Sequence, residues 1–310
     1  MNGGETLRFI IEIKRSKEGY LMKLENERLC VEIADMGAEV TRIYDKKNGT
    51  DVLWEADPVY WKRHSPVLFP NVGKTYKNTI LINGVQYPTS QHGFARDNEF
   101  RCIRASEDSA SFLFASNEET KEVYPFEFEL IITYRLEKNS LTVKWEVRNP
   151  SDETIYFTIG GHPAFRFAGK DEVKADYLLK FPGKEELQYV LIDPAEAAVD
   201  PKKVHELKLD GECYQVSEEL FEHDALIFDG GQIGEVWLYH KDGTPYVGMK
   251  CEGFPNFGIW SVKDAPFVCL EPWMGRADNI GFDRDISEKP GINAVDPGEC
   301  FEKEYTVIVA

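Results

Sequence analysis

The sequence predicts an all-β fold, a large antiparallel β-sandwich. Short apolar runs that suit strands follow one another along the chain, separated by Gly, Pro, Asn or Asp, and no segment keeps the 3.6-residue period of an amphipathic helix. Aromatic residues make up 13% of the chain, which suits the wide space between two packed sheets. Because β-sandwiches of more than about 200 residues occur as one unit, and no linker-like stretch interrupts residues 1–310, we expect a single domain.

Two Asn-Gly pairs predict hairpins in the first third of the chain. Asn48-Gly49 leads into the apolar residues 52–54, and Asn83-Gly84 stands between the runs 80–82 and 85–87. Asn and Gly both tolerate the positive φ that tight hairpin turns need, so this dipeptide is a strong short-range signal.

The clearest strand covers residues 141–148, where apolar and polar residues alternate strictly. This period of two predicts one buried and one exposed face. Residues 128–136 precede it across a short polar turn, so the two segments should pair as a hairpin. Further strands are predicted at 111–115, 154–159, 175–180, 187–191, 225–228, 235–240, 245–251, 257–262 and 304–309.

Helix is expected in only two short segments. Residues 193–198 can begin a helix with Asp193 as N-cap and Pro194 as the first helical residue. Residues 217–223 can hold a turn or two of helix. Neither segment changes the all-β prediction.

The charge balance excludes two classes of partner. The chain has 36 Lys and Arg against 54 Asp and Glu, a formal net charge of -18, which repels a phosphate backbone and an anionic membrane surface. No apolar stretch approaches the roughly 18 residues of a membrane helix, and no signal-like segment opens the chain. We therefore expect a cytoplasmic protein that binds neither nucleic acid nor membrane.

The cysteines show no spacing typical of a disulfide frame or a zinc knuckle. No two of them form a C-x-x-C pair, and several lie in or beside apolar runs. We expect buried, reduced thiols. The six are Cys30, Cys102, Cys213, Cys251, Cys269 and Cys300.

Three ionisable residues stand in settings that a purely structural role does not need. Glu271 follows the apolar run 266–270 and precedes Pro272; because proline cannot donate to a sheet ladder, we expect a strand to end here and to present Glu271 to a cleft. His92 and His162 both lie in glycine-containing turns, and His162 follows a predicted strand. The structural alternatives are a solvated glutamate and two hydrogen-bonded histidines.

Such a set of two histidines and a carboxylate admits three chemistries. It is the ligand set of many catalytic zinc sites, but the residues lack the i, i+4 spacing of the helical motif. Nucleophilic catalysis needs an activated Ser or Cys, and no G-x-S-x-G or similar context occurs. General acid and base catalysis by a histidine facing a carboxylate needs no additional residue, so we favour it over a metal site.

An ordered series of short motifs resembles the aldose 1-epimerase (galactose mutarotase-like) family, and within it the LacX-like branch. The resemblance spans roughly residues 20–310. Its motifs are Phe-Pro-Asn-x-Gly at 69–73, His-Gly-Phe-Ala-Arg at 92–96, Gly-His-Pro-Ala-Phe at 161–165, Glu-Pro-Trp at 271–273 and Pro-Gly-Glu at 297–299. The resemblance implies a galactose mutarotase-like supersandwich and a cofactor-independent isomerase that interconverts the α and β anomers of an aldohexose.

The resemblance also implies roles for individual residues. Glu271 would be the general base that takes the proton of the anomeric hydroxyl, and His162 the general acid that protonates the ring oxygen, starting as an imidazolium beside a carboxylate. His92 would hydrogen-bond near the ring oxygen. Asp224 would accept sugar hydroxyls, and Trp273 is a stacking candidate.

Two departures leave the substrate open. Galactose mutarotases carry an Arg where this chain has Lys74, which offers a point charge rather than a bidentate fork. The motif around His92 is also similar to the hexose-6-phosphate 1-epimerase branch, where Arg96 and Lys74, with Arg63 as a third candidate, could hold a phosphate. The expected ligand is therefore a small-molecule sugar or sugar phosphate. A non-catalytic carbohydrate-binding or sensor protein of the same fold is the rival from another class, and the oligomeric state stays open.

Overall fold

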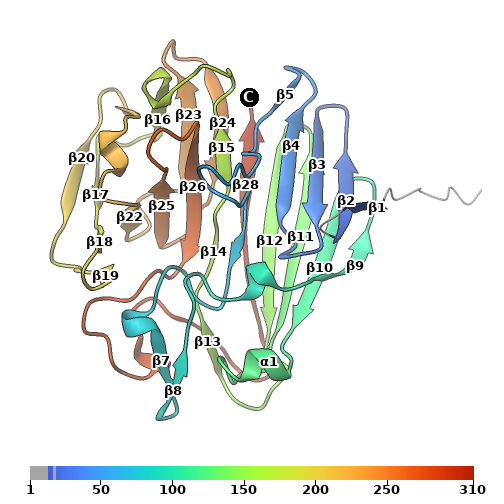
Figure 1. The fold of residues 1–310 in the computed structure, drawn as a ribbon, viewed down its shortest axis with the longest axis vertical. Helices are drawn as coiled ribbons and strands as arrows, with labels where there is room; N and C mark the ends of the chain where they lie inside the picture. The colour runs from blue at the N-terminus through green and yellow to red at the C-terminus, as the bar shows by residue number, and fades with distance from the viewer. Residues whose placement is uncertain (1–12, 17–18) are drawn as a thin grey trace, which may run out of the picture.

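The computed structural model describes residues 13–16 and 19–310, and this part of the chain is built almost entirely from strands (Figure 1). The all-β prediction is confirmed. The largest sheet has nine strands in the order β21 (Cys213–Gln215), β16 (Tyr177–Lys180), β23 (Glu235–His240), β24 (Pro245–Lys250), β28 (Cys300–Val309), β12 (Ser140–Arg148), β11 (Glu129–Glu137), β10 (Ser109–Ala115) and β9 (Arg101–Ala105).

Two smaller sheets accompany it. The first has five strands in chain order: β1 (Ile13–Ser16), β2 (Gly19–Glu25), β3 (Leu29–Ala34), β4 (Val40–Asp45) and β5 (Thr50–Asp51). The second has six strands, in the order β22 (Leu226–Asp229), β25 (Asn256–Trp260), β26 (Phe267–Met274), β14 (Ile159–Gly161) and β6 (Val67–Leu68), with β15 (Ala164–Arg166) also paired to β26.

Short two-stranded ladders and single helical turns make the connections. The ladders are β7 (Thr79–Ile82) with β8 (Val85–Pro88), β13 (Ile155–Phe157) with β27 (Asn293–Val295), β17 (Glu186–Tyr189) with β20 (His205–Lys208), and β18 (Ile192–Asp193) with β19 (Ala198–Val199). The one α-helical turn among the described residues is α1 (Glu118–Lys121), and 3₁₀ turns lie at Tyr76–Asn78, Ala95–Asp97, Lys174–Asp176, Glu219–Phe221 and Ile286–Glu288.

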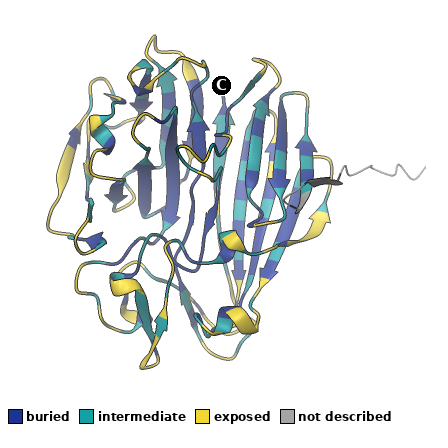
Figure 2. Ribbon diagram, viewed as in Figure 1, coloured by how far each residue is buried: buried dark blue, intermediate teal, exposed yellow. Residues whose placement is uncertain are grey.

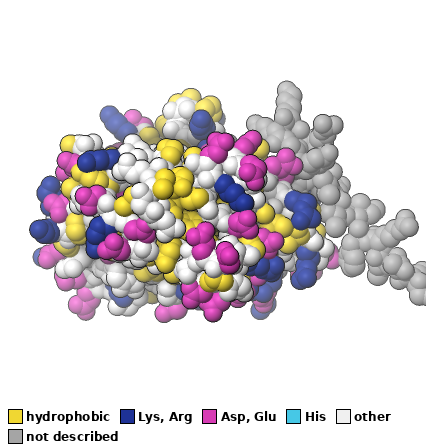
Figure 3. Space-filling model, turned by 90° about the horizontal axis from the view of Figure 1, so that it is seen from below, with side chains coloured by type: hydrophobic (Ala, Val, Ile, Leu, Met, Phe, Trp, Pro, Cys, Tyr) yellow, Lys and Arg dark blue, Asp and Glu magenta, His cyan; other side chains and the backbone are white. Residues whose placement is uncertain are grey.

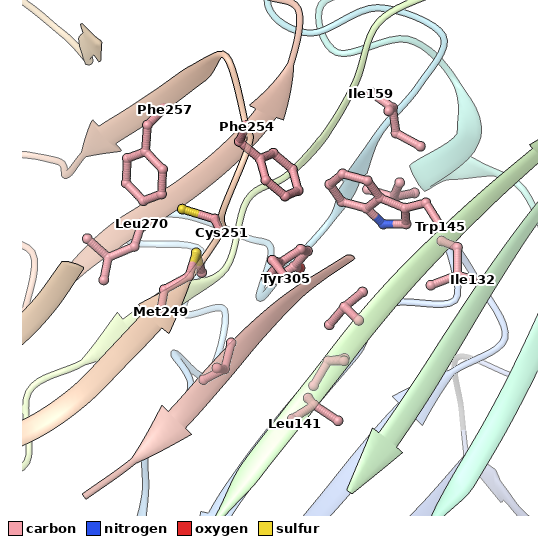
Figure 4. Close-up of a cluster of buried hydrophobic side chains, with 14 of the residues drawn as sticks. Ile132, Leu141, Trp145, Ile159, Met249, Cys251, Phe254, Phe257, Leu270 and Tyr305 are labelled. Carbon is pink, nitrogen blue, oxygen red and sulfur yellow. The ribbon is translucent and has the colours of Figure 1, made fainter. Parts of the chain in front are cut away.

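One continuous hydrophobic core joins the three sheets. It includes Val31 from the five-stranded sheet, Trp145 and Tyr305 from the nine-stranded sheet, and Phe257 and Leu270 from the six-stranded sheet. Figure 4 shows several of these side chains pointing toward one another from different strands. Buried residues follow the inner strands, whereas exposed residues gather in loops and turns and on the outlying strands β9 and β20 (Figure 2). This arrangement is the sandwich that the sequence predicts.

The surface carries both signs of charge. On the face shown in Figure 3, acidic and basic side chains are interspersed around a central group of hydrophobic ones. The net charge of -18 comes from 54 Asp and Glu against 36 Lys and Arg. No helix among the described residues is long and apolar enough to cross a membrane.

The local predictions of strands and hairpins are confirmed. Strand β12 alternates between buried and partly exposed residues until its last, and it pairs with β11 through Leu136 opposite Leu141. Asn83 and Gly84 both have positive φ and join β7 to β8. The Asn48-Gly49 turn joins β4 to β5, with Asp45 opposite Thr50. Each of the further predicted strands overlaps an observed one, with ends that differ by a few residues.

The predicted helix at 193–198 is wrong. The Asp193 carboxylate does accept the N–H groups of Ala195 and Glu196, as an N-cap would. However, Asp193 pairs with Ala198 and the segment closes the β18–β19 hairpin. An Asp side chain can satisfy the same two donors in a turn or in a helix, so its cap signal does not separate the two. The segment 217–223 does hold one helical turn, at Glu219–Phe221.

All six cysteines are free, as predicted, but not all are buried. Cys30, Cys251 and Cys269 are buried, whereas Cys102 and Cys300 are exposed. Cys102 lies on β9, which is the edge of the nine-stranded sheet, so an apolar neighbourhood in sequence does not cover it.

Candidate functional site

Glu271 lies inside a strand and not at its end, contrary to the sequence prediction. Strand β26 continues to Met274, and Glu271 pairs with Gly258 of β25. The residue is buried, with 1% of its surface exposed. A carboxylate held by a central strand has little freedom to move, which suits a group that must meet a substrate in one orientation.

The neighbouring sheet explains why Pro272 does not end the strand. The N–H of Leu270 donates to Pro163, on the side of β14 and β15. Because alternate residues of a strand point their N–H groups the same way, the nitrogen of Pro272 also faces that side. Opposite Pro272, the segment between β14 and β15 is not paired with β26. No carbonyl therefore waits for an N–H from residue 272, and the proline costs the sheet no hydrogen bond.

His162 occupies this break in the ladder and contacts Glu271. It directly follows β14, and its Nε2 lies 3.3 Å from the Oε2 of Glu271. Its ring stacks on Trp61, with centroids 4.7 Å apart, and meets the edge of Trp260 at 5.5 Å. Two indole rings therefore fix the plane of the imidazole, and the reactive atoms of the pair are adjacent.

His92 lies next to His162, with ring centroids 5.6 Å apart. Its Nδ1 accepts the N–H of Gly73 at 3.1 Å, and burial lowers the pKa of the ring well below its usual value. The ring is therefore neutral, and its proton lies on Nε2, which is a donor. His92 also has a φ of 66°. Residues other than glycine rarely adopt this conformation, and those that do are often found at functional sites.

All seven predicted site residues line one cleft of about 640 Å³. Its volume is within the range of small-molecule sites. The seven are Lys74, His92, Arg96, His162, Asp224, Glu271 and Trp273. Residues more than 190 positions apart in the sequence thus meet at one concave surface. General acid and base catalysis by these residues requires that they meet in this way.

The aromatic walls of this cleft were not predicted from the sequence. Trp61 and Trp260 line it and contact His162, and Gln91 and Lys62 line it as well. Trp61 stands in a polar loop, Tyr60-Trp61-Lys62-Arg63. A large aromatic side chain in such a loop was the available signal, because loops seldom bury one without a reason.

Trp273 lines the cleft and packs closely against the two neighbouring strands. A Cβ added to Gly160 would come within 2.4 Å of its ring, and one added to Gly258 within 2.3 Å. Glycines on both neighbouring strands therefore make room for the indole. Its Nε1 is buried and makes no hydrogen bond of normal geometry among the described residues.

Burial shifts the protonation of the central pair toward its uncharged form. It raises the pKa of Glu271 well above its usual value, with a further contribution from Asp224, while the nearby indole of Trp273 opposes the shift. Burial likewise lowers the pKa of His162, to about 3. In the resting pair the shared proton therefore lies on Glu271, which is a carboxylic acid, and His162 is a neutral imidazole. The sequence led us to expect the opposite state, an imidazolium facing a carboxylate. The neutral state is favoured because neither charge would be solvated here.

Charges on the two sides of the cleft differ. Arg96 and Arg63 lower the pKa of both histidines, whereas Asp224 raises that of Glu271. The two arginines share one carboxylate: Arg63 Nη2 lies 2.7 Å from Asp97, and Arg96 Nε lies 3.7 Å from it. Positive charge thus remains on the histidine side. Asp224 is exposed, with a φ of 74°, just ahead of β22.

Comparison with known proteins gives the family. The aldose 1-epimerase family matches residues 20–280 of this chain. The plasmid-encoded Protein LacX of Lactococcus lactis subsp. lactis is 29% identical over 296 residues, which are 93% of this chain and 99% of that protein. The chromosomal Protein LacX of the same organism is equally similar.

Solved structures show the same fold. A galactose mutarotase related enzyme from Lactobacillus acidophilus has a TM-score of 0.88 and 32% identity, covering 94% of this chain and 97% of its own. A galactose mutarotase-like protein from Lactobacillus casei ATCC 334 has a TM-score of 0.85 and 28% identity, covering 94% of this chain and 100% of its own. The strand order, the cleft and these matches agree: the chain belongs to the aldose 1-epimerase family, with LacX among its relatives and a galactose mutarotase-like fold.

Proposed function

We propose that this protein is an aldose 1-epimerase that interconverts the α and β anomers of an aldohexose. The observation that carries the proposal is the distance of 3.3 Å between His162 Nε2 and Glu271 Oε2 in an open cleft. The anomeric hydroxyl and the ring oxygen of a pyranose are bonded to the same carbon. A base and an acid that serve these two oxygens must therefore be neighbours, and this pair meets that condition.

Ring opening requires that the anomeric hydroxyl lose a proton and that the ring oxygen gain one. The Glu271 carboxylate removes the proton of the anomeric hydroxyl, the C1–O1 bond becomes a carbonyl, the bond between C1 and the ring oxygen breaks, and His162 Nε2 protonates the ring oxygen. Rotation about the C1–C2 bond then presents the other face of the aldehyde. Reclosure returns both protons to their starting residues, so no cofactor or redox partner enters the balance.

The bound sugar supplies the protonation state that this reaction needs. In the resting pair the single proton is on Glu271, whereas the reaction starts with it on His162. A sugar hydroxyl that donates a hydrogen bond to the carboxylate favours its ionised form. His92 Nε2 can donate a hydrogen bond to an adjacent sugar oxygen, and the Asp224 carboxylate can accept hydrogen bonds from sugar hydroxyls at the other side of the cleft.

The test is the decay of optical rotation of freshly dissolved α-glucose and α-galactose. The wild-type protein should accelerate this decay for at least one aldohexose. If it accelerates neither hexoses nor hexose phosphates, the assignment fails. Sugar binding in calorimetry without any effect on the rate would instead support the rival, a carbohydrate-binding or sensor protein.

A hexose 6-phosphate is the second candidate substrate, because four cations line the cleft of an otherwise acidic protein. They are Lys62, Arg63, Lys74 and Arg96. The ring oxygen is bonded to C5, which carries C6, so a sugar with its ring oxygen at His162 directs C6 toward the histidine side. The positive charge of Arg63 and Arg96 lies on that side. This geometry supports a phosphate there.

Replacement of Arg63 by Gln should separate the two substrates. We expect the KM for a hexose 6-phosphate to rise about tenfold, because one charge-assisted phosphate contact is lost. The KM for the unphosphorylated hexose should change little. Steady-state kinetics with both sugars measure this difference, and Arg101→Gln on the exposed edge strand β9 is the matched control. Equal changes for both sugars would exclude a phosphate site at Arg63.

A further inference from the structure

Cys269 is a buried thiol beside the acid–base pair, and the proposed reaction does not use it. It lies two residues before Glu271 on β26, so both side chains point to the same face of the strand. One ligand atom each from His162, Cys269 and Glu271 lies within 4.8 Å of the others, and all three residues are buried. A central strand and the break after β14 therefore bring an imidazole, a thiol and a carboxylate together.

We propose that these three side chains form an inhibitory site for a thiophilic divalent cation such as Zn²⁺. Imidazole nitrogen, thiolate sulfur and carboxylate oxygen are the ligands that zinc takes in proteins. His162 and Glu271 line the cleft, so an ion can reach them from there, and a water or sugar oxygen in the cleft can complete its coordination. Three protein ligands with one open position is also the pattern of accessible zinc sites.

The distances require only a small adjustment. Ligand atoms around one tetrahedral zinc ion lie about 3.5 Å apart, given bond lengths of about 2.0–2.3 Å. The contact between His162 and Glu271, at 3.3 Å, already meets this spacing. The sulfur of Cys269 lies within 4.8 Å of the other two ligand atoms, so it has to approach them by at most about 1.3 Å.

Bound zinc would stop proton exchange. It occupies the lone pair of the His162 nitrogen and the carboxylate oxygen of Glu271, and these are the atoms that the sugar needs. The thiol proton of Cys269 and the proton held by the pair leave to solvent as the bonds form. The predicted inhibition rests on the proposed mutarotase function. The predicted binding of the metal ion does not depend on that function.

A second group of possible ligands provides the contrast. Glu146, Cys300 and Glu302 also lie within reach of one ion, but Cys300 and Glu302 are exposed. Solvated ligands of this kind are common on acidic surfaces and hold an ion weakly. Cys300→Ser is therefore the matched control, because it removes the other thiol that belongs to such a group among the described residues.

Cobalt absorption tests the site without any activity. Purified full-length protein is freed of metal with a chelator and titrated with Co²⁺. We expect a near-ultraviolet thiolate-to-cobalt band that Zn²⁺ abolishes, that persists in Cys300→Ser and that is absent in Cys269→Val. No band in the wild type, or a band that survives Cys269→Val, overturns the proposal. Cys269→Ala replaces the valine variant if circular dichroism shows the latter to be misfolded.

Inhibition is measured in parallel on hexose mutarotation. Zn²⁺ should inhibit the wild type and Cys300→Ser equally, while Cys269→Val keeps the metal-free rate and needs at least about tenfold more Zn²⁺ for the same inhibition, since one ligand is lost. Unchanged sensitivity of Cys269→Val, or activation by Zn²⁺, overturns the proposal. If the metal-free wild type accelerates no sugar, the proposed function fails, and the cobalt spectrum still decides whether the metal site exists.

Discussion

Glu271→Gln should lower the kcat of hexose mutarotation about 10²–10⁴-fold, the range that general base catalysis contributes. The amide has nearly the same shape as the carboxylic acid but cannot take a proton from the anomeric hydroxyl. His162→Asn should cause a similar loss, because it removes the proton donor to the ring oxygen. Polarimetry of fresh α-glucose or α-galactose, at equal concentrations of folded protein, measures both effects.

These losses should not come from unfolding. Burial raises the pKa of Glu271, so at neutral pH folding requires this carboxylate to take up a proton, which costs free energy that a neutral Gln does not. The melting temperature of Glu271→Gln should therefore equal or exceed that of the wild type. Glu222→Gln, an exposed change of the same chemistry outside the cleft, is the control and should keep full activity.

The double variant gives a further check of the pair as a unit. If Glu271 and His162 act in the same step, removing both should reduce the rate little more than removing one, because neither residue is useful without its partner. Losses that multiply would show two independent roles. A Glu271→Gln variant with the full wild-type rate would refute the assignment of the base.

The sequence alone predicts the local features of this fold well. Alternation over residues 141–148 and the Asn83-Gly84 pair each depend on a few neighbouring residues, and the structure has the strand and the hairpin where they indicate. The error at 193–198 has the same local origin, since the Asp193 carboxylate caps a turn and a helix by the same hydrogen bonds. Local sequence signals identify turns and strands, but they do not show which other segments of the chain these pack against.

The site depends on pairings that no local pattern contains. His162 meets Glu271 because β14 pairs with β26, strands more than 100 residues apart in the sequence. The family resemblance pointed to these two residues before the structure placed them. Neither the stacking of Trp61 on His162 nor the closeness of Cys269 to the pair could be predicted, because loop conformation and side-chain packing decide both.

The turn that carries His92 also depends on a contact between distant backbones, at Gly93. This residue has a φ of 68°, and a Cβ built on it would lie 2.2 Å from the carbonyl oxygen of Phe69. The obstacle is backbone, which cannot rotate away as a side chain can. Gly93→Ala should therefore require the turn to shift and carry His92 with it.

We expect Gly93→Ala to lower the free energy of unfolding by about 4 kcal/mol or more, because a left-handed backbone and a backbone clash act together. Urea denaturation measures it as a fall in the midpoint at an unchanged m-value. Gly84→Ala is the matched control: its φ is 79°, but nothing lies within 4 Å of the added Cβ, so it should lose only about 1 kcal/mol from the strained backbone. Equal losses in the two variants would mean that the contact with Phe69 does not hold the turn. A selective loss in Gly93→Ala, together with weaker sugar binding by the folded fraction, would show that the same contact positions His92 over the cleft.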